Sequence, residues 1–559
     1  MRISAIPQLY RNVNRWGEIL SVLSKYGLAN WVSRLDWDFA KRFFKDADGE
    51  LLARHRPEVR IRLALAELGP TFIKLGQILS TRADLVGVDL ATELQHLQTS
   101  VRADPPDAVR ATIESELGRN IEAVFAELSD EPIASASIGQ VHLARLRNGQ
   151  EVVVKVQHAG IAEKIRVDLD ILIGLSQMAE MVPEFVPYRP RAVVAEFQRA
   201  LRRELDFSRE ERNMRQFAFD FADDPTVCIP RSFPELCTAR VLTMEHLVGI
   251  RLIERERLVS AGYDLKEVAR RGAELYLKMI FVHGCYHADP HPGNVVVMPG
   301  NVIGLLDFGM VGRIDESLRE SIEEMLSALV EHDALHLTSL ITRIGMTPPQ
   351  LDQAALSVDL ADFVAHYAHQ RLDEFDLGGA LNEMMEIIRR YQIMLPERVA
   401  MLVKVFVMLE GTSRLLSPTF SLMEVMQPYK KQLVWRRLSP LRHARKLRRL
   451  YSELEYLAEV FPRGVVDILQ QVQTGKFDVH LDHRGLEPSV NRLVLGLLAS
   501  ALFLGSAMLL SMKVPPLIPW PGFLGQPSLL GTVGSTLSIL LGLRLWRAIN
   551  KSGHLDRRK

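Results

Sequence analysis

Three polar residues, Asp289, Asn294 and Asp307, lie close together in the sequence and carry side chains that bind a hard metal ion. Carboxylate and amide oxygens are the ligands that Mg²⁺ prefers in proteins. The segment His287–Asn294 contains two prolines and one glycine, which stiffen the turn that holds the first two residues. Phosphoryl transfer needs little more from a protein than a bound Mg²⁺ and a carboxylate aimed at the nucleophile. The three residues therefore predict a site for phosphoryl-transfer chemistry.

A β-hairpin is predicted between Asn294 and Asp307. The apolar stretches Val295–Met298 and Val302–Leu306 flank the turn sequence Pro299-Gly300-Asn301, and the second stretch ends at Asp307. Asp307 begins the tripeptide Asp-Phe-Gly, which on its own is most often a chance match. The hairpin and the correctly spaced polar residues upstream favour a functional motif.

The spacing of these residues resembles the catalytic loop and the Asp-Phe-Gly motif of protein kinases. The resemblance implies that Asp289 is the catalytic residue and that Asn294 and Asp307 bind Mg²⁺. No Ala-Pro-Glu follows Asp-Phe-Gly, and the chain continues directly into the predicted helix Glu316–Glu331. Ordinary protein kinases use that missing segment to build a platform for protein substrates. Its absence argues against phosphorylation of exposed protein loops.

Upstream, small residues precede a strand rich in valine. They predict a tight hairpin whose backbone N–H groups face phosphates. These loop residues are Ile133, Ala134, Ser135, Ala136, Ser137, Ile138, Gly139, Gln140 and Val141. The turn sequence Asn148-Gly149 then leads into the strand Glu151–Gln157, which contains Lys155. A lysine among valines is costly unless its ammonium meets an anion, so Lys155 predicts a phosphate contact. The alternative is an edge-strand lysine that faces solvent.

Five motifs in chain order resemble the UbiB family of atypical kinases, which is called ADCK in animals. They are Lys-x-Gly-Gln at 74–77, the loop rich in Ala and Ser, residues 201–210, the segment His287–Asn294, and Asp-Phe-Gly at 307–309. The resemblance covers about Leu65 to Val330. It implies an α+β, helix-rich, bilobal protein-kinase-like fold with an N-terminal helical extension and two C-terminal transmembrane helices. It also implies that the chain uses ATP and Mg²⁺.

The resemblance assigns further roles residue by residue. Lys155 resembles the lysine that contacts the α- and β-phosphates, and Glu210 the helix glutamate that pairs with it. A second set consists of family-specific residues, namely Lys74, Gln77, Glu204 and Asp206. In this set the resemblance implies that Glu204 and Asp206 contact Lys74. It also implies that Gln77 points toward the nucleotide. From the residues alone, the alternative for the three acids is a charged helix face. Ser135 stands where many members have alanine.

The apolar strand within residues 239–247 occupies the position that meets adenine and joins the two lobes. Met244 then gates the adenine site, and the backbone of Glu245 and Leu247 bonds the base. An ordinary strand and turn is the alternative. Between Lys155 and Glu210, the stretches Ile161–Met181 and Arg191–Arg203 predict amphipathic helices that match the family's insert.

Composition bounds the remaining possibilities. The 559 residues exceed one ordinary core, so two or more domains are expected. Lys and Arg together number 68, as do Asp and Glu, and this balance argues against a nucleic-acid partner. Three cysteines without metal spacing fit a reducing compartment.

The predicted domains are 1–64 (N-terminal helices), 65–130 (family-specific helical extension), 131–250 (N-lobe, with an insert at about 161–203), 251–480 (helical C-lobe), 490–545 (transmembrane hairpin) and 546–559 (basic cytosolic tail).

The N-terminal residues 1–60 predict amphipathic helices with apolar points at Trp16, Leu20, Leu23, Tyr26 and Trp31. Such helices either pack on the main domain, which we favour, or face a membrane or a partner. The first residues lack the apolar core of a signal peptide and the composition of a transit peptide. The catalytic part is therefore expected in the cytosol.

Two C-terminal stretches are long enough to cross a bilayer. Leu493–Met512 is uncharged, prolines interrupt the chain after it, and Ser528–Leu543 is the second uncharged stretch. Small residues spaced by four predict close helix packing, namely Gly496, Ser500, Gly534, Ser538 and Gly542. Basic residues flank both spans, which predicts a bacterial inner membrane protein with both ends cytosolic. Nine Lys or Arg without an acid in 430–449 indicate either contact with anionic lipid or a solvated surface.

The family resemblance implies a membrane-anchored kinase or ATPase that supports ubiquinone biosynthesis, with a quinone precursor lipid or quinone-biosynthetic enzymes as partners. Two other classes stay open: a non-catalytic ATP-sensing scaffold for such enzymes, and a small-molecule kinase of the aminoglycoside or choline type. The phosphate acceptor, with water among the options, and the oligomeric state, with a homodimer among the options, are also open.

Overall fold

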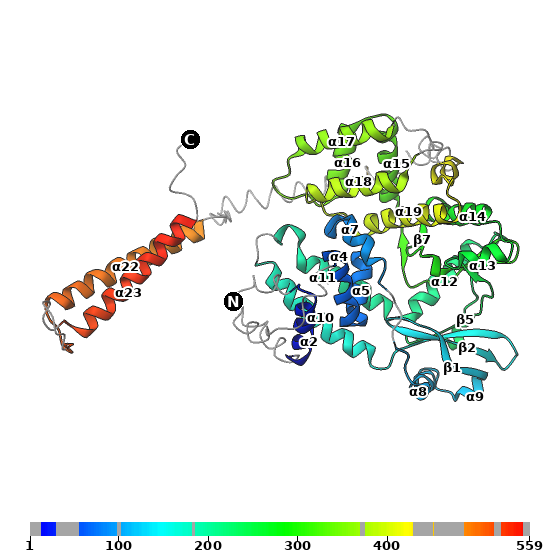
Figure 1. Ribbon diagram of the computed structural model, residues 1–559, viewed down its shortest axis with the longest axis horizontal. Helices are drawn as coiled ribbons and strands as arrows, with labels where there is room; N and C mark the ends of the chain where they lie inside the picture. The colour runs from blue at the N-terminus through cyan, green and yellow to red at the C-terminus, as the bar shows by residue number, and fades with distance from the viewer. Residues whose placement is uncertain are drawn as a thin grey trace. The chain divides into compact units, whose positions relative to one another are not determined.

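The computed structural model describes residues 13–28, 55–97, 102–181, 185–368, 375–428, 451, 455, 486–518 and 527–551. It divides into two compact units, Met1–Ser439 (unit 1) and Pro440–Lys559 (unit 2), which are described separately (Figure 1). Trp31, the basic segment 430–449 and most of the predicted tail lie outside the described residues. Unit 1 confirms the helix-rich α+β fold with two lobes.

The N-lobe contains a four-stranded antiparallel sheet in the order β1-β2-β3-β5. Its strands are β1 (Phe125–Ser135), β2 (Gly139–Leu146), β3 (Glu151–Gln157) and β5 (Val241–Glu245). Val152, Val154 and Val156 alternate along β3 and are almost fully buried beneath α8 (Pro106–Leu117) and α9 (Ile121–Val124). Because side chains alternate across a strand, Lys155 faces the other side of the sheet.

β1 begins at Phe125, inside the stretch 65–130 that the sequence predicted as helical. The reason is the burial of Phe125 and Leu128, which join the apolar cluster between the sheet and α8. A helix through these residues could not pair with β2, whose Leu146 lies opposite Phe125. The N-lobe sheet therefore starts earlier than predicted.

The family insert is helical, as predicted. It consists of α10 (Ile161–Ala179) and α11 (Pro190–Glu204), and α12 (Phe207–Asp220) follows it on the far side of the sheet from α8. Asp206 is the N-cap of α12 and accepts a hydrogen bond from the Ser208 N–H at 3.1 Å. A short polar side chain at this position satisfies one of the free N–H groups of the first turn.

The C-lobe begins with α13 (Arg255–Ser260) and α14 (Leu265–Lys278), and η6 (Met279–His283) extends α14 as a π-helical turn. The hairpin predicted between Asn294 and Asp307 is confirmed as β8 (Val295–Met298) and β9 (Val302–Leu305). The short elements around it are β4 (Val227–Cys228), η5 (Pro234–Leu236), β6 (Ile250–Arg251), β7 (Cys285–His287), η7 (Pro292–Asn294) and β10 (Val311–Arg313). Pairing of β7 with β10 joins the two ends of the catalytic segment.

Among the described residues of the C-lobe, five further helices form a second apolar core, with Leu356, Leu360 and Ile393 fully buried. They are α15 (Glu316–Val330), α16 (Ala334–Ile344), α17 (Gln353–Ala368), α18 (Leu377–Arg390) and α19 (Glu397–Leu416). As predicted, α15 begins shortly after Asp-Phe-Gly.

The N-terminal helices pack on unit 1, which confirms the favoured alternative for them. Trp16, Leu20 and Tyr26 of α2 are buried in the main apolar core. The N-terminal helices are α2 (Val13–Lys25), α4 (Pro57–Leu68), α5 (Pro70–Leu79), α6 (Ala83–Val86) and α7 (Val88–Leu94). Within the insert, the short helix η4 (Val186–Tyr188) lies between α10 and α11.

A fully buried carboxylate, Asp168 of α10, connects three helices of this region. Arg15 of α2 donates to it at 2.7 Å, and the Thr71 hydroxyl of α5 donates at 2.6 Å. The Arg15 guanidinium also reaches the Leu68 carbonyl at 2.7 Å. Burial alone would penalise both charges, so their mutual contact is what makes the arrangement stable.

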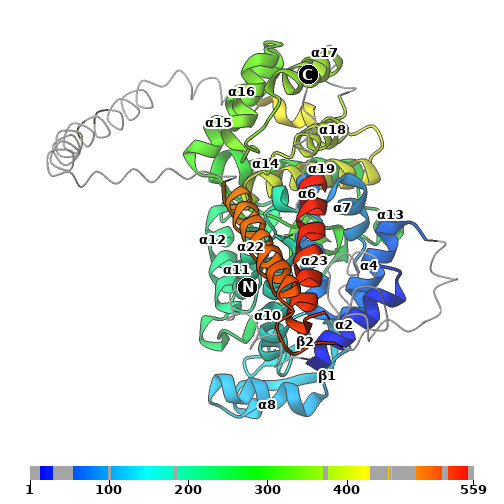
Figure 2. The same ribbon diagram turned by 90° about the vertical axis from the view of Figure 1, so that its left-hand side faces the viewer.

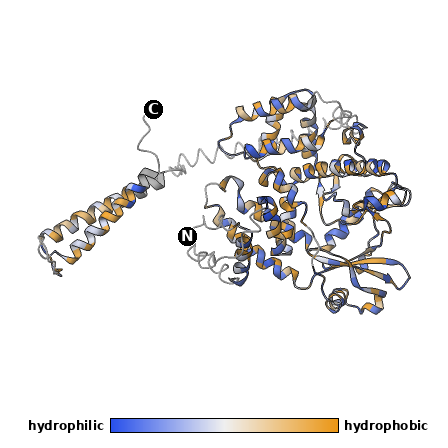
Figure 3. Cartoon of the chain, in the orientation of Figure 1, coloured by the Kyte–Doolittle hydropathy of each residue, from blue (hydrophilic) through white to orange (hydrophobic). Residues whose placement is uncertain are grey.

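Unit 2 is a helical hairpin of α22 (Leu486–Ser511) and α23 (Leu529–Lys551), which lie side by side in both views (Figures 1 and 2). Their apolar windows, Leu493–Ser511 and Leu529–Arg547, have mean hydropathies of 2.3 and 1.4, and only 6% and 11% of them are buried within the structure. Apolar residues predominate along both helices (Figure 3). By length and composition, each helix could cross a membrane.

The helix contact in unit 2 uses only part of the predicted small-residue pattern. A Cβ on Gly534 would lie 2.2 Å from the Ser506 hydroxyl oxygen, and one on Gly531 would lie 2.7 Å from the Leu510 side chain. Ser538 is buried, but a Cβ on Gly542 would meet nothing within 4 Å. The prediction that Gly542 lies at the close contact is therefore wrong, because its Cβ position has open space where Gly534 meets Ser506.

Replacing Asp168 by alanine is expected to destabilise unit 1 by about 3 kcal/mol, because the Arg15 guanidinium is left part-buried without its carboxylate. Denaturant unfolding of the purified protein, followed by tryptophan fluorescence, measures this. Glu163→Ala on the same helix is the control, since its pair with Arg166 is exposed and should leave stability unchanged. Equal stability of the two variants would contradict the role of Asp168.

Gly534→Leu is expected to lower the thermal stability of the hairpin in detergent micelles, because the new side chain meets Ser506 across the helix contact. Gly542→Leu is the matched control on the same helix, where the added side chain has open space. Thermal unfolding of α-helix, followed by circular dichroism, compares them. A larger loss for Gly542→Leu would show that the contact is on the other face.

Candidate functional site

Lys155 lies at the centre of a cluster of charges between β3 and α12. Its ammonium is 2.8 Å and 2.9 Å from the two carboxylate oxygens of Glu210, so the predicted pair is formed. Asp307 brings an Oδ1 atom to 3.9 Å from the same ammonium. The ring of Phe207 lies 5.1 Å below it. Glu210 lies 55 positions after Lys155 in the sequence, and Asp307 lies 152 positions after it. The fold thus brings both residues to the Lys155 ammonium.

The charges of this cluster are coupled, and burial opposes them. Burial raises the pKa of Glu210, and the Lys155 charge only partly offsets this shift. Burial by itself would lower the pKa of Lys155, but the carboxylates of Asp307 and Glu210 outweigh it and raise the pKa above its ordinary value. Burial would raise the pKa of Asp307, and the Lys155 charge together with the Gly309 N–H, which donates at 2.8 Å, holds it well below the usual range. The ammonium and the Asp307 carboxylate are therefore both charged at neutral pH.

Asp289 and Asn294 come together across the turn predicted to hold them. The Asn294 amide nitrogen donates to an oxygen of Asp289 at 2.8 Å, which leaves the amide oxygen of Asn294 for a metal ion. His291 accepts from the Gly293 N–H at 3.0 Å and caps the short helix η7 that ends at Asn294. The Leu306 N–H donates to the Asn294 carbonyl at 3.0 Å and fastens the turn to the strand that leads to Asp307.

Two buried rings hold the Asp-Phe-Gly segment in place. Phe308 is fully buried, with Phe217 of α12 at 5.5 Å and His287 at 5.9 Å between ring centroids. The His287 Nε2 atom contacts the Asp307 carbonyl, while its Nδ1 accepts from the Asp289 N–H at 3.2 Å. The imidazole therefore connects the predicted catalytic residue to a predicted metal ligand through their backbones.

The loop between β1 and β2 is shorter than predicted, because Ile133–Ser135 belong to β1 and Gly139–Val141 to β2. Within the described residues, the N–H groups of Ser137 and Ile138 make no hydrogen bond. The Ser137 hydroxyl is also buried without a partner. Unused donors in one turn are the arrangement that binds an anion, so the loop fits a nucleotide phosphate.

The predicted adenine contacts use the backbone of Glu245 and Leu247, and one of their two N–H groups is already in use. Met244 is buried at the end of β5, and the Glu245 N–H already donates to the Arg231 carbonyl at 2.9 Å. The Leu247 N–H, by contrast, makes no hydrogen bond among the residues described. Of the two N–H groups, that of Leu247 is the one left to meet a base.

The family-specific residues divide into two groups. Lys74 of α5 pairs with Glu204 of α11 at 3.0 Å, as predicted. Asp206 instead caps α12 and lies 3.7 Å from Arg212, so the predicted contact between Asp206 and Lys74 is wrong. Gln77 is half-buried, and its side-chain amide makes no hydrogen bond in the described part of the chain.

Lys404 of α19 is a site residue that the sequence analysis missed. Burial lowers its pKa, the negative charge of Asp289 opposes this shift, and the positive charge of Lys74 adds to it. Its ammonium has no acidic partner within 4 Å among the described residues. The available signal was a single lysine in the apolar helical run 400–409.

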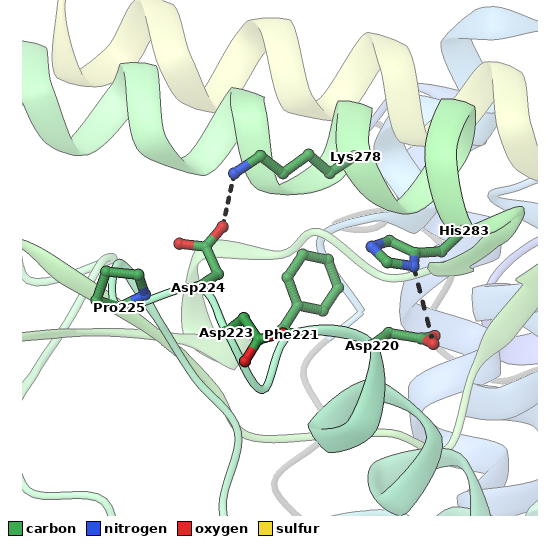
Figure 4. Close-up of a pocket in the computed structure, with 7 residues that line it drawn as sticks. All are labelled: Asp220, Phe221, Asp223, Asp224, Pro225, Lys278 and His283. Atoms are coloured by element: carbon green, nitrogen blue, oxygen red, sulfur yellow. Dashed lines mark hydrogen bonds and ion pairs between the residues drawn. The ribbon is translucent and has the colours of Figure 1, made fainter.

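A separate cavity of about 380 Å³ lies at the far end of α12 from Glu210 (Figure 4). Four of its polar groups are already paired, Asp224 with Lys278 at 2.6 Å and Asp220 with His283 at 3.8 Å. No residue predicted to bind nucleotide or metal lines it.

Comparison with known proteins agrees with the geometry. Residues 96–341 match the ABC1 atypical kinase-like domain, 360–421 the UbiB helical domain, and 480–551 the ABC1/UbiB kinase-like C-terminal domain. An "Uncharacterized protein in hydrogenase 1 5'region" of Clostridium pasteurianum is 31% identical, over 97% of this chain and 100% of the relative. A "Probable protein kinase UbiB" of Azotobacter vinelandii is 32% identical, over 88% of this chain and 91% of the relative.

A solved structure is similar over a smaller share of this chain. The complex of Rv3197 with erythromycin from Mycobacterium tuberculosis matches with a TM-score of 0.45 and 23% identity, over 65% of this chain and 93% of that chain.

Gly139→Ala is expected to weaken ATP binding about tenfold or more, because the added Cβ would lie 2.4 Å from the Val156 carbonyl oxygen and push the loop off β3. Fluorescent-nucleotide titration of the purified protein measures this. Gly149→Ala is the control, in the distal turn of the same sheet, where no atom lies within 4 Å of the new Cβ but the positive φ carries its own cost. Loss of ATP affinity in the control alone would contradict the assignment of the loop.

Proposed function

The chain belongs to the ABC1/UbiB family of atypical kinase-like proteins, and on that basis we propose that it binds Mg-ATP and transfers or hydrolyses its terminal phosphoryl group in support of ubiquinone biosynthesis. The observation that carries the proposal is the convergence of Lys155, Glu210 and Asp307 beside a loop with unused N–H donors. That convergence supplies contacts for phosphates and for a metal ion in one place.

The residues then divide the work. Lys155 binds the α- and β-phosphates and is held in position by Glu210. Asp307 and the amide oxygen of Asn294 would hold Mg²⁺, which neutralises phosphate charge when bound. Few protein ligands suffice, because Mg²⁺ keeps waters and binds substrate phosphates as well. Asp289 orients the acceptor and takes its proton.

Membrane anchoring belongs to the same proposal. The exposed apolar faces of α22 and α23 would lie in the bilayer, and the basic residues that flank them, Arg492, Arg544 and Arg547, would stay on the cytosolic side of a bacterial inner membrane. An anchor of this kind places the kinase-like unit where a very apolar quinone precursor, or the enzymes that modify it, would be found.

Substitutions at the two acids test this function. With the full chain in detergent micelles, Asp307→Asn is expected to reduce Mg²⁺-dependent ATP turnover at least a hundredfold, since it removes a ligand charge. Asp289→Asn should retain nucleotide binding and lose turnover to a similar extent. Asp223→Asn in the separate cavity is the control and should turn over ATP normally.

The same variants distinguish an enzyme from a scaffold. In cells that lack the chromosomal gene, quinone intermediates measured by mass spectrometry should remain abnormal with Asp289→Asn. Full restoration of quinone levels by that variant would favour the non-catalytic scaffold. Unchanged turnover in Asp307→Asn would overturn the metal assignment.

A further inference from the structure

The nucleotide loop is fastened by a group of three residues, Asp104, Ala136 and His158, which we name the loop clasp. His158 follows β3 and is almost fully buried. Its Nε2 atom is 2.9 Å from the Ala136 carbonyl, and its Nδ1 atom lies 3.2 Å from a carboxylate oxygen of Asp104 without forming a hydrogen bond to it. Its backbone N–H donates to the Ile138 carbonyl at 2.9 Å. One residue thus contacts both ends of the three-residue turn.

The clasp is a ring nitrogen that donates to a carbonyl. The Ala136 carbonyl can only accept, so its bond with His158 needs the ring proton on Nε2, and the Nδ1 atom makes no hydrogen bond among the described residues. The ring is almost fully buried, so losing this bond would leave a buried carbonyl without its partner. The clasp therefore restrains the Ala136 carbonyl.

Because the peptide bond is planar, fixing the Ala136 carbonyl also fixes the direction of the Ser137 N–H. In a trans peptide the C=O of one residue and the N–H of the next point to opposite sides. Holding the Ala136 carbonyl against His158 therefore turns the Ser137 N–H away from the clasp. That N–H is one of the two unused donors of the loop.

Asp104 anchors the clasp at its other end. The same Asp104 oxygen accepts from the Ala159 N–H at 2.8 Å, and the Asp104 N–H donates to the buried Gln140 side chain of β2 at 2.7 Å. The segment that precedes α8 is thereby bonded to β2 and to the residues that follow β3. None of these residues lies among the predicted contacts to phosphate, metal or acceptor, except Ala136 and Gln140 of the loop itself.

From this geometry we infer that His158 is a positioning residue for the nucleotide: bonded to the carbonyls of Ala136 and Ile138, it fixes the turn and so presents the Ser137 N–H to a nucleotide phosphate. The inference rests on the proposed ATP site. It goes beyond that proposal, because it assigns the order of the loop to a residue outside the motifs. A loop ordered in advance does not lose that freedom on binding, which improves affinity.

Hydrogen exchange on the full chain without nucleotide tests the clasp independently of ATP. His158→Phe removes the ring donor to the Ala136 carbonyl and is expected to speed amide exchange of residues 136–139 at least tenfold. His158→Arg supplies a donor to the same carbonyl and should keep exchange near the wild-type rate. Asp104→Asn leaves the ring in place, weakens the acceptor for the Ala159 N–H and should give an intermediate rate.

Steady-state kinetics supply the second readout. His158→Phe is expected to raise the KM for Mg-ATP about tenfold while kcat stays within twofold, and His158→Arg should restore KM. His283→Phe is the control, a histidine that faces a carboxylate in the other lobe and has no contact with the loop. A purely structural role would lower stability and leave KM for the folded protein unchanged.

The outcomes separate the two proposals. Wild-type exchange of residues 136–139 in both His158→Phe and Asp104→Asn overturns the clasp, as does an unchanged KM in a folded His158→Phe protein. If the wild-type chain shows no affinity for Mg-ATP, the proposed function fails, and the exchange data still decide whether the clasp orders the loop. If His158→Phe does not fold, Asp104→Asn carries both measurements.

Discussion

One ammonium shared between two carboxylates is the contact on which the site depends. Lys155 meets Glu210 directly and Asp307 more distantly, so the cluster holds more negative than positive charge. Taking such charges from water is unfavourable unless they compensate one another, and the surplus carboxylate creates a place for a cation. A bound magnesium ion would complete the balance. The surrounding helices and strands hold the side chains of Lys155, Glu210 and Asp307 together.

Each member of the cluster is supplied by a different element, and each element has its own support. β3 is fixed by its buried valines, α12 by the Asp206 cap and by Phe217, and Asp-Phe-Gly by the buried Phe308. The Asn213 side chain of α12 donates to the Phe308 carbonyl at 3.0 Å and ties two of these elements directly. The N-terminal helices add support from outside through Asp168 and through Lys74 paired with Glu204.

The parts of the site that could be predicted from the sequence are those set by local spacing or by a recognised family motif. Asp289 and Asn294 are close in sequence, and two prolines restrict the turn between them, so their contact follows from the chain itself. Asp206 was assigned to the wrong partner because a side chain just before a helix bonds the free N–H groups of that helix first. His158 and Lys404 went unrecognised, because their surroundings come from segments distant in sequence. Gly542 shows the same limit, since the rotation of a helix is decided by its neighbour.

The order of the units along the chain has a consequence for biogenesis. Both membrane-crossing candidates follow unit 1, and the first begins only at Leu486. At about 5 to 20 residues per second, synthesis of the preceding residues takes roughly 25 to 100 s. The cluster around Lys155 can therefore assemble before either of these two candidates emerges from the ribosome. In the membrane-anchored protein that we propose, delivery to the bilayer then becomes a late event that follows the synthesis of unit 1.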